Sequence, residues 1–339
     1  MDVSLLDRSR VRAGEPDGQA LHHTAARAVR ADELGFHRFW VAEHHAVPGI
    51  ASGSPAVLLA AIGQVTSRIR LGSGGVMLPQ HQPLVVAEQF RMLEALFPDR
   101  IDLGVGASLG FTGAVRRALR REQASSEEID EEIRELLRFL RDEEAITARP
   151  RTSEVPVHVL ASRSGIERAA RLGLPVVVGG PMVHDEQLPA LLAEYRASFR
   201  GEHPHVMLSV DVFAGPTAAR ARELALPEAW AMAMTRRTGE FRPLEPVDQI
   251  LARSWPDRVR ERIEKHLDGV FLGTEADVTT RLAALVDATG ADEILASTST
   301  FDTTALADLD AALFRAAHGA ASDRRDEADR DAAGVSSLS

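Results

Sequence analysis

The sequence predicts an α/β fold, and within that class a (β/α)₈ TIM barrel. Two observations support this prediction. Short runs of β-branched and aliphatic residues alternate with longer stretches whose apolar residues recur at helical spacing. The chain, with 339 residues of which 45% are hydrophobic, is long enough to bury one large core. We expect eight strands, the number that closes a parallel barrel, over residues 3–6, 38–41, 69–72, 101–105, 155–160, 175–178, 206–213 and 293–296.

Start and stop signals mark several of the helices between these strands. Ser54 and Pro55 open one helix, because serine caps a helix and proline suits its first turn. Gly35 and Gly173 each follow a leucine at the end of a helical pattern, which is typical of a helix C-terminus. These signals place strand and helix in regular alternation.

Two segments depart from the regular alternation. The acidic stretch 122–144 predicts a solvated helix on the outside of the barrel, with a lid or partner surface as the alternative. Prolines interrupt segment 240–268, which we interpret as an insertion before the last strand that lines a substrate pocket. We expect residues 1–318 to form a single domain and the polar residues 319–339 to form a disordered C-terminal tail.

The bulk composition excludes several classes of protein. A formal net charge of −11 argues against a nucleic-acid partner, because binding to nucleic acid depends on basic residues that neutralise its phosphates. No apolar run reaches the roughly 18 residues of a membrane span, and no leader pattern opens the chain, so we predict a cytoplasmic protein without a membrane partner. The absence of cysteine removes disulfides and thiolate chemistry. We therefore expect a small-molecule substrate.

The second predicted strand runs into Glu43, His44 and His45, and strand ends carry the chemistry of α/β barrels. If His44 points into the barrel mouth, His45 points toward the rim, because neighbouring strand residues face opposite sides. A catalytic and a structural role are both open for His44, since an ordinary histidine titrates near neutral pH. A metal site is disfavoured, because consecutive side chains diverge and no further cluster has ligand spacing, so we predict no metal.

Glycines follow the third predicted strand at positions 72, 74 and 75. One interpretation is a bulge or tight turn. The other is that the missing side chains let a flat ring cofactor, such as a flavin, lie against a strained or cis backbone.

Two further loops follow strands. Segment 104–110 has the spacing G-x-G-x-x-x-G, which does not match the dinucleotide fingerprint, so we disfavour a Rossmann site and keep a phosphate-facing loop as an alternative. Segment 161–165 contains Ser162, Arg163, Ser164 and Gly165 before a helix. Hydroxyls and free amides at a helix N-terminus make an anion site, although an ordinary serine cap explains the pattern equally well.

Several of these segments together resemble the bacterial luciferase-like flavin-dependent monooxygenases. The resemblance extends from the first strand to about Arg315 and is densest over the first 110 residues. It is carried by segments 31–36, 39–45, 68–79, 83–89, 100–106 and 291–302.

The resemblance implies a TIM barrel that takes reduced FMN from a separate flavin reductase and uses O2 to oxidise a small organic or secondary-metabolite substrate. It implies that catalytic His44 transfers a proton or donates a hydrogen bond beside the reacting part of the flavin. It further implies a non-proline cis peptide at Gly74–Gly75 under the ring, a phosphate grip at Ser162, Ser164 and Gly165, and a homodimer.

One position departs from this family pattern. Many relatives carry an arginine after Gly106, where this chain has Ala107. Losing a bidentate phosphate contact costs about 2 kcal/mol, or more than tenfold in affinity, unless Arg163 compensates. A noncatalytic or weakly flavin-binding barrel subunit and a deazaflavin-dependent oxidoreductase therefore stay open as alternatives.

Overall fold

Eight parallel strands close into a barrel in the computed structural model, which describes residues 2–238 and 240–318. The strand order around the barrel is β1-β10-β7-β6-β5-β4-β3-β2, so the first strand pairs with the last, Asp2 opposite Glu293. The prediction of a (β/α)₈ barrel is confirmed. The barrel strands are β1 (Asp2–Asp7), β2 (Arg38–Val41), β3 (Arg70–Met77), β4 (Ile101–Gly106), β5 (Val157–Ala161), β6 (Val176–Gly179), β7 (Val206–Val210) and β10 (Glu293–Ala296).

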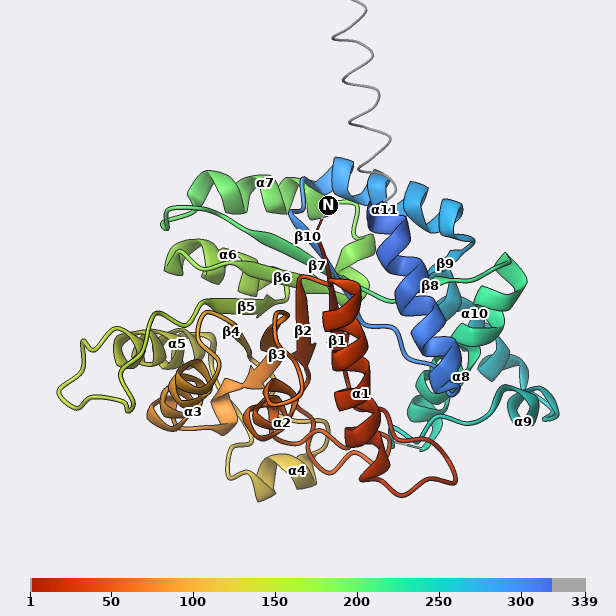
Figure 1. Ribbon diagram of the computed structural model, residues 1–339, viewed down its shortest axis with the longest axis horizontal. Coiled ribbons are helices and arrows are strands. Elements are labelled where there is room, and N and C mark those ends of the chain that lie inside the picture. Colours follow the sequence, from red (N-terminus) through yellow and green to blue (C-terminus); the bar gives the residue numbers. More distant parts are fainter. Residues whose placement is uncertain (1, 239, 319–339) are drawn as a thin grey trace, which may run out of the picture.

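Helices surround the strands (Figure 1). They are α1 (Gln19–Leu34), α2 (Pro55–Gly63), α3 (Pro83–Leu96), α4 (Gly113–Ala118), α5 (Ser126–Leu140), α6 (Arg163–Leu172), α7 (Leu188–Ser198), α8 (Ala218–Thr238), α9 (Val247–Leu251), α10 (Asp257–Asp268) and α11 (Glu275–Thr289), with short 3₁₀ turns η1 (Leu78–Gln80) and η2 (Gly180–His184) and a last helix over 303–318. The predicted boundaries at Pro55, Gly35 and Gly173 are confirmed, and both glycines adopt the left-handed conformation.

The seventh predicted strand, 206–213, is wrong as a single element. The barrel strand β7 ends at Val210, and the chain then forms a separate strand β8 (Val212–Ala214), which pairs with β9 (Phe271–Gly273) outside the barrel. Asp211 marks the break, because its carboxylate accepts a hydrogen bond from Ser297 at 2.6 Å and pairs with Arg8 at 3.3 Å. Asp211 is therefore a polar residue with polar partners between two apolar strands, and β7 ends before it.

The barrel interior changes character from one end to the other. Trp40, Met207 and Ala42 pack inside it with Leu6, Leu160, Val177 and Leu295. Toward the amino ends of the strands lie two buried carboxylates, Asp102 and Glu293, which Arg38 bridges at 2.7 and 3.1 Å. The apolar layer therefore separates a buried ionic network from the carboxyl ends of the strands.

The acidic stretch forms α5, which is only partly the solvated helix that we expected. Ile129, Ile133 and Leu136 are buried, and the helix packs on α3. Its start is fixed by a capping box between Ser125 and Glu128. Its outer face is solvated, whereas its inner face belongs to the core.

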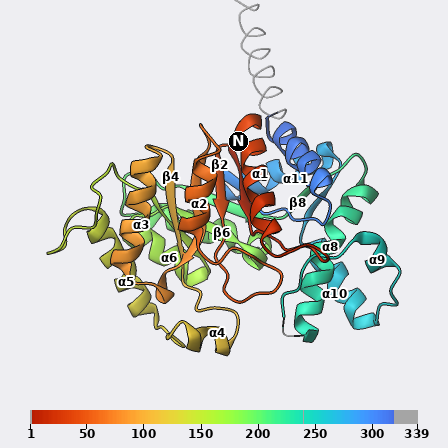
Figure 2. The ribbon, with the colours of Figure 1, turned by 60° about the horizontal axis from the view of Figure 1, so that its bottom comes forward.

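Segment 240–268 forms α9 and α10, and α10 packs against α8 over a second, smaller apolar core. Figure 2 shows α8, α9 and α10 on the opposite side of the barrel from α3 and α5. No helix in the described part of the chain is long and apolar enough to cross a membrane. The predicted tail at 319–339 lies outside the described residues.

Candidate active site

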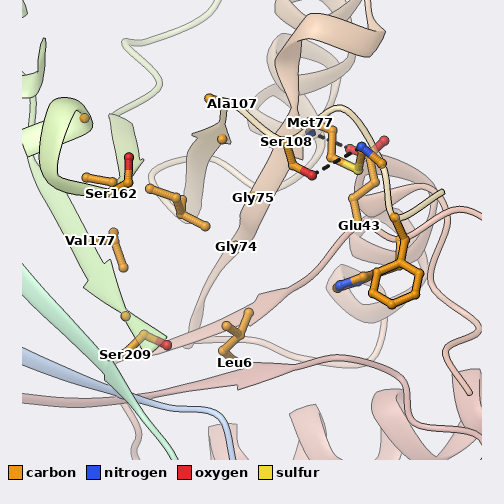
Figure 3. A pocket seen from close by; sticks show the side chains of 18 of the residues that line it. Leu6, Glu43, Gly74, Gly75, Met77, Ala107, Ser108, Ser162, Val177 and Ser209 are labelled. Carbon is orange, nitrogen blue, oxygen red and sulfur yellow. Dashed lines mark hydrogen bonds between the residues drawn. The ribbon is translucent and has the colours of Figure 1, made fainter. Parts of the chain in front are cut away.

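A cavity of about 740 Å³ opens at the carboxyl ends of the barrel strands. The apolar layer inside the barrel forms part of its wall through Leu6, Leu160, Val177 and Leu295. Figure 3 shows Glu43 and Met77 on one side of this cavity and Ser162 and Val177 on the other. Six of the predicted site residues line it: His44, Gly74, Gly75, Ala107, Ser162 and Gly165.

His44 is held in the cavity wall as a neutral imidazole. Burial, together with the positive charges of Arg8 and Arg10, lowers the pKa of His44 to about 4. Its Nδ1 atom is buried and has no hydrogen-bond partner within the described residues. A neutral imidazole has one donor and one acceptor nitrogen, so His44 is equipped to bind a polar atom of a ligand.

Glu43 gathers two histidines and a backbone amide around one buried carboxylate. Its Oε1 lies 2.6 Å from Nε2 of His45 and 2.7 Å from Nε2 of His81, and its Oε2 accepts the N–H of Met77 at 2.8 Å. Burial alone would raise the pKa of Glu43, but these partners outweigh burial and lower it. The same three side chains form a donor set that could hold a metal ion.

His81 was missed by the sequence analysis, which found no further ligand-type residue near Glu43 and His45. His81 follows β3 by only a few residues, and β2 and β3 are paired, so their ends meet. The adjacency of consecutive parallel strands was the signal that would have found it.

The Gly74–Gly75 peptide bond is cis, as expected for this step. A Cβ on Gly74 would lie 2.6 Å from Leu6 Cδ1, and a Cβ on Gly75 would lie 2.9 Å from the carbonyl oxygen of Gly104. The pairing of β3 with β4 also shifts register between Ser73 and Val76. The backbone contact requires glycine at position 75, whereas at position 74 the end of the Leu6 side chain would have to move; the same step lines the cavity.

One face of α6 contributes to the cavity. Ser162 caps the helix without a side-chain hydrogen bond of its own, and Gly165 and Arg168 follow at intervals of three residues, which places all three on one side. Arg163 and Ser164 do not line the cavity. The Arg163 guanidinium instead contacts Asp185 at 3.0 Å and Gln187 at 2.9 Å, so the structure does not support it as a substitute for a cation at position 107.

Arg168 is a cavity residue that the sequence analysis missed. Its helical spacing from Ser162 and Gly165 was the available signal. Its side chain is 5% exposed and contacts Asp130 on α5. The acidic helix therefore reaches the site through one buried ion pair.

A second cavity, of about 750 Å³, adjoins the first and shares Leu6 and Ser209 with it. Lys265, His266 and Asp268 at the end of α10 line it, as do Arg8, Asp211 and His184. The predicted insertion at 240–268 therefore lines a pocket beside the barrel mouth.

Comparisons with known proteins agree with this geometry. A family model for luciferase-like monooxygenases matches residues 1–293. The chain is 33% identical over 310 residues to a luciferase-like monooxygenase of Escherichia coli K12, covering 88% of this chain and 92% of that protein. It is 37% identical over 236 residues to the N-acetyl-S-alkylcysteine monooxygenase of Bacillus subtilis, covering 65% of this chain and 70% of that protein.

Solved structures show the same fold. Apo-MsnO8 superposes with a TM-score of 0.84 at 32% identity, covering 94% of this chain and 98% of that one. The oxygenating constituent of 3,6-diketocamphane monooxygenase from Pseudomonas putida, in complex with FMN, gives a TM-score of 0.72 at 18% identity, covering 93% and 97%. The chain thus belongs to the luciferase-like monooxygenase family.

Proposed function

We propose that this protein is an FMN-dependent monooxygenase that uses reduced FMN and O2 to oxidise a small organic substrate. The observation that carries the proposal is that His44, the Gly74–Gly75 step and the start of α6 all line one cavity. The FMN complex of a fold neighbour supports the same assignment. When bound, the reduced flavin would give two electrons to O2, so that one oxygen atom enters the substrate and the other leaves as water.

The cavity residues fit such a cofactor. The orphaned Nδ1 of His44 is available to a polar atom of the ring system, and the backbone at Gly74 and Gly75 offers a surface without side chains. Ser162 and the N-terminus of α6 suit a phosphate group, because the first amides of a helix lack partners within it. Ser164 does not line the cavity, so the only support for a phosphate-binding role is its position in the first turn of α6.

The neutral state of His44 suits a hydrogen-bonding role beside the ring. With its pKa lowered to about 4, mainly by burial, the imidazole is uncharged at neutral pH, so it donates a hydrogen bond at one nitrogen and accepts one at the other. The apolar wall of Leu6, Leu160 and Val177 restricts water at the base of the same cavity.

We propose that the second cavity receives the organic substrate. It borders the cofactor cavity at Leu6 and Ser209, so a molecule within it reaches the barrel mouth. We further propose that a separate reductase supplies reduced FMN, that the protein acts in the cytoplasm, and that it forms a homodimer. Exposed apolar side chains on the neighbouring helices α2 and α3 support the last of these, among them Val57, Val85, Met92 and Leu96.

Oxygenation assays test the proposal directly. The protein is supplied with FMN, a flavin reductase and NADH under ¹⁸O2, and a panel of thioethers, ketones and aromatic compounds is screened by mass spectrometry. We expect one ¹⁸O atom in the product of at least one substrate. We expect His44→Ala to lose about 100-fold in rate, whereas His22→Ala, at an exposed position of α1, keeps the wild-type rate.

The two alternatives make different predictions. A noncatalytic subunit, favoured by the uncharged Ala107, would bind no flavin saturably and would associate with an active homologue. A deazaflavin-dependent oxidoreductase, an activity found in an F420-dependent alcohol dehydrogenase of the same fold, would bind F420 and transfer hydride without consuming O2. Either result would replace the monooxygenase proposal.

A further inference from the structure

We propose that Arg168 of α6 binds the terminal phosphate of FMN and so takes over the role of the arginine that position 107 lacks. The inference rests on the proposed function, since it assigns a residue of this chain to the cofactor named there. It concerns a position on a helix, whereas the family resemblance places the cation directly after β4.

The position of Arg168 is the first argument. The side chain is 5% exposed and lines the cavity together with Ser162 and Gly165. A Cβ placed on Gly165 would lie 3.9 Å from Nη1 of Arg168, so this nitrogen lies at the helix face that borders the cavity. Within the described residues, Arg168 is the only arginine or lysine that lines this cavity.

The hydrogen bonds of Arg168 leave one nitrogen for a ligand. Nε donates to Oδ1 of Asp130, and Nη2 donates to Oγ of Ser126 at 2.8 Å. Nη1 has no hydrogen-bond partner among the residues that the structure describes. Two contacts on α5 therefore fix the guanidinium plane, and the third nitrogen is available toward the cavity.

Asp130 is shared among several guanidinium groups. It contacts Arg168, Arg171 at 2.7 Å and Arg134 at 3.7 Å, and Arg134 also pairs with Glu131 at 3.3 Å. Asp130 is therefore not an exclusive partner of Arg168, which leaves the guanidinium able to pair with an anion as well.

The N-terminus of α6 is a second feature that suits a phosphate group. The helix has ten residues, and its cap Ser162 uses no side-chain hydrogen bond to close the first turn. Free amides and the helix dipole at such an end attract phosphate, and a buried guanidinium beside it gives the site a full charge. Ala107 in the same cavity offers no competing cation.

Arg168 also has a structural role, because it ties α6 to α5 through Asp130. The test must therefore separate phosphate binding from packing. Riboflavin provides this separation, because it carries the ring system and the ribityl chain of FMN without the phosphate.

The experiment measures the Kd of oxidised FMN and of riboflavin by fluorescence titration. For Arg168→Met, which keeps the length of the side chain, we expect FMN binding to weaken about 10- to 100-fold and riboflavin binding to stay within about twofold. Arg171→Met is the matched control, because Arg171 contacts the same Asp130 from an exposed position outside the cavity lining. We expect it to change neither Kd. The double variant Arg168→Met with Ala107→Arg should recover FMN binding.

Several outcomes would overturn the inference. Equal losses for FMN and riboflavin would show that Arg168 only supports packing, and unchanged FMN binding would remove it from the site. If the wild-type protein binds neither compound, the proposed function itself fails. If Arg168→Met does not fold, ³¹P NMR of FMN bound to the wild-type protein decides: contact with Arg168 keeps the phosphate dianionic below its ordinary pKa of about 6, and an unshifted titration contradicts the contact.

Discussion

Glu43 accepts the backbone N–H of Met77 at 2.8 Å, and this hydrogen bond joins the loop after β2 to the end of β3. The same carboxylate holds His45 and His81, while its neighbour His44 lines the cavity at the barrel mouth. Glu43 thus joins the segment that carries the candidate catalytic histidine to the end of β3 and holds the next side chain, His45.

Replacing Glu43 should destabilise the protein. Glu43→Gln keeps the shape but replaces one acceptor oxygen by an N–H2 donor that faces donors, so we expect a loss of about 2 kcal/mol or more in the free energy of unfolding. Urea denaturation measures it. Glu33→Gln, at an exposed position of α1, serves as the control and should stay within about 0.5 kcal/mol. An equally small effect of Glu43→Gln would contradict a supporting role.

We expect the cluster of Glu43, His45 and His81 to function without a metal ion. The distances of 2.6 and 2.7 Å between their ligand atoms are those of hydrogen bonds, and Met77 already occupies the second carboxylate oxygen. Elemental analysis of the purified protein should find no stoichiometric metal, and dialysis against a chelator should leave flavin affinity and stability unchanged. One equivalent of zinc or iron retained through dialysis would contradict this prediction.

Stability should fall as the pH falls from about 6.5 toward 4. Burial lowers the pKa of His158 to about 4 from an ordinary 6.5, and burial also lowers that of His44 to about 4. Between pH 6.5 and pH 4 these two histidines are protonated in the unfolded chain but stay neutral in the folded chain. Adding acid therefore stabilises the unfolded state relative to the folded state. For His158 alone the effect is on the order of 3 kcal/mol.

Urea denaturation at pH 7.5 and at pH 5 checks this dependence. His158→Phe removes the titrating group but keeps an aromatic ring against Trp40, whose centroid lies 5.1 Å from that of His158. The variant should lose stability less steeply than the wild type as the pH falls. Identical slopes would show that His158 does not contribute.

Substitution by alanine should strongly destabilise the protein at one glycine of β4 and have little effect at another. A Cβ on Gly104 would lie 2.1 Å from the carbonyl oxygen of Ser73, whereas one on Gly106 would make ordinary contacts at 3.9 Å. We expect Gly104→Ala to cost about 3 kcal/mol or to prevent folding, and Gly106→Ala to stay within about 1 kcal/mol. Thermal denaturation of the pair compares them, and equal melting temperatures would refute the assigned packing.

The homodimer prediction is tested on α3. Leu96 is 56% exposed and lies on the apolar side of α2 and α3, so Leu96→Glu should shift the protein toward monomer in light scattering. Leu251→Glu is the control, because Leu251 is 58% exposed but lies on α9, on the other side of the barrel (Figure 1). A wild-type monomer, or a dimer insensitive to Leu96→Glu, would contradict this interface.

Barrel and helix boundaries were predictable from the sequence because they depend on local patterns. Alternating apolar runs, Pro55 and the glycines at 35 and 173 act within a few residues of their own position. The break at Asp211 was not predictable in the same way, because its partners Arg8 and Ser297 are far from it in the sequence and follow β1 and β10.

The candidate site also contains residues that local sequence patterns predict and residues whose contacts depend on segments far away in the sequence. His44 follows β2, and Gly74 and Gly75 lie in the second half of β3, so the pairing of these two strands brings all three to one cavity. Arg168 shares the helical spacing of Ser162 and Gly165, so the sequence carried a signal for it. The partners that hold Arg163 outside the cavity, Asp185 and Gln187, come from a later segment and could not be read from the local pattern.

The pairing of Asp2 with Glu293 places the seam of the barrel between its first and last strands. During synthesis, β1 leaves the ribosome long before its neighbour β10 exists, so one edge of the growing sheet stays unpaired until almost the whole chain has been made. The hydroxyl of Ser4, which donates to Glu293 in the folded protein, also lacks its acceptor until β10 has been made. A product that ends before residue 293 therefore leaves this edge of β1 exposed, and an unpaired strand edge promotes aggregation.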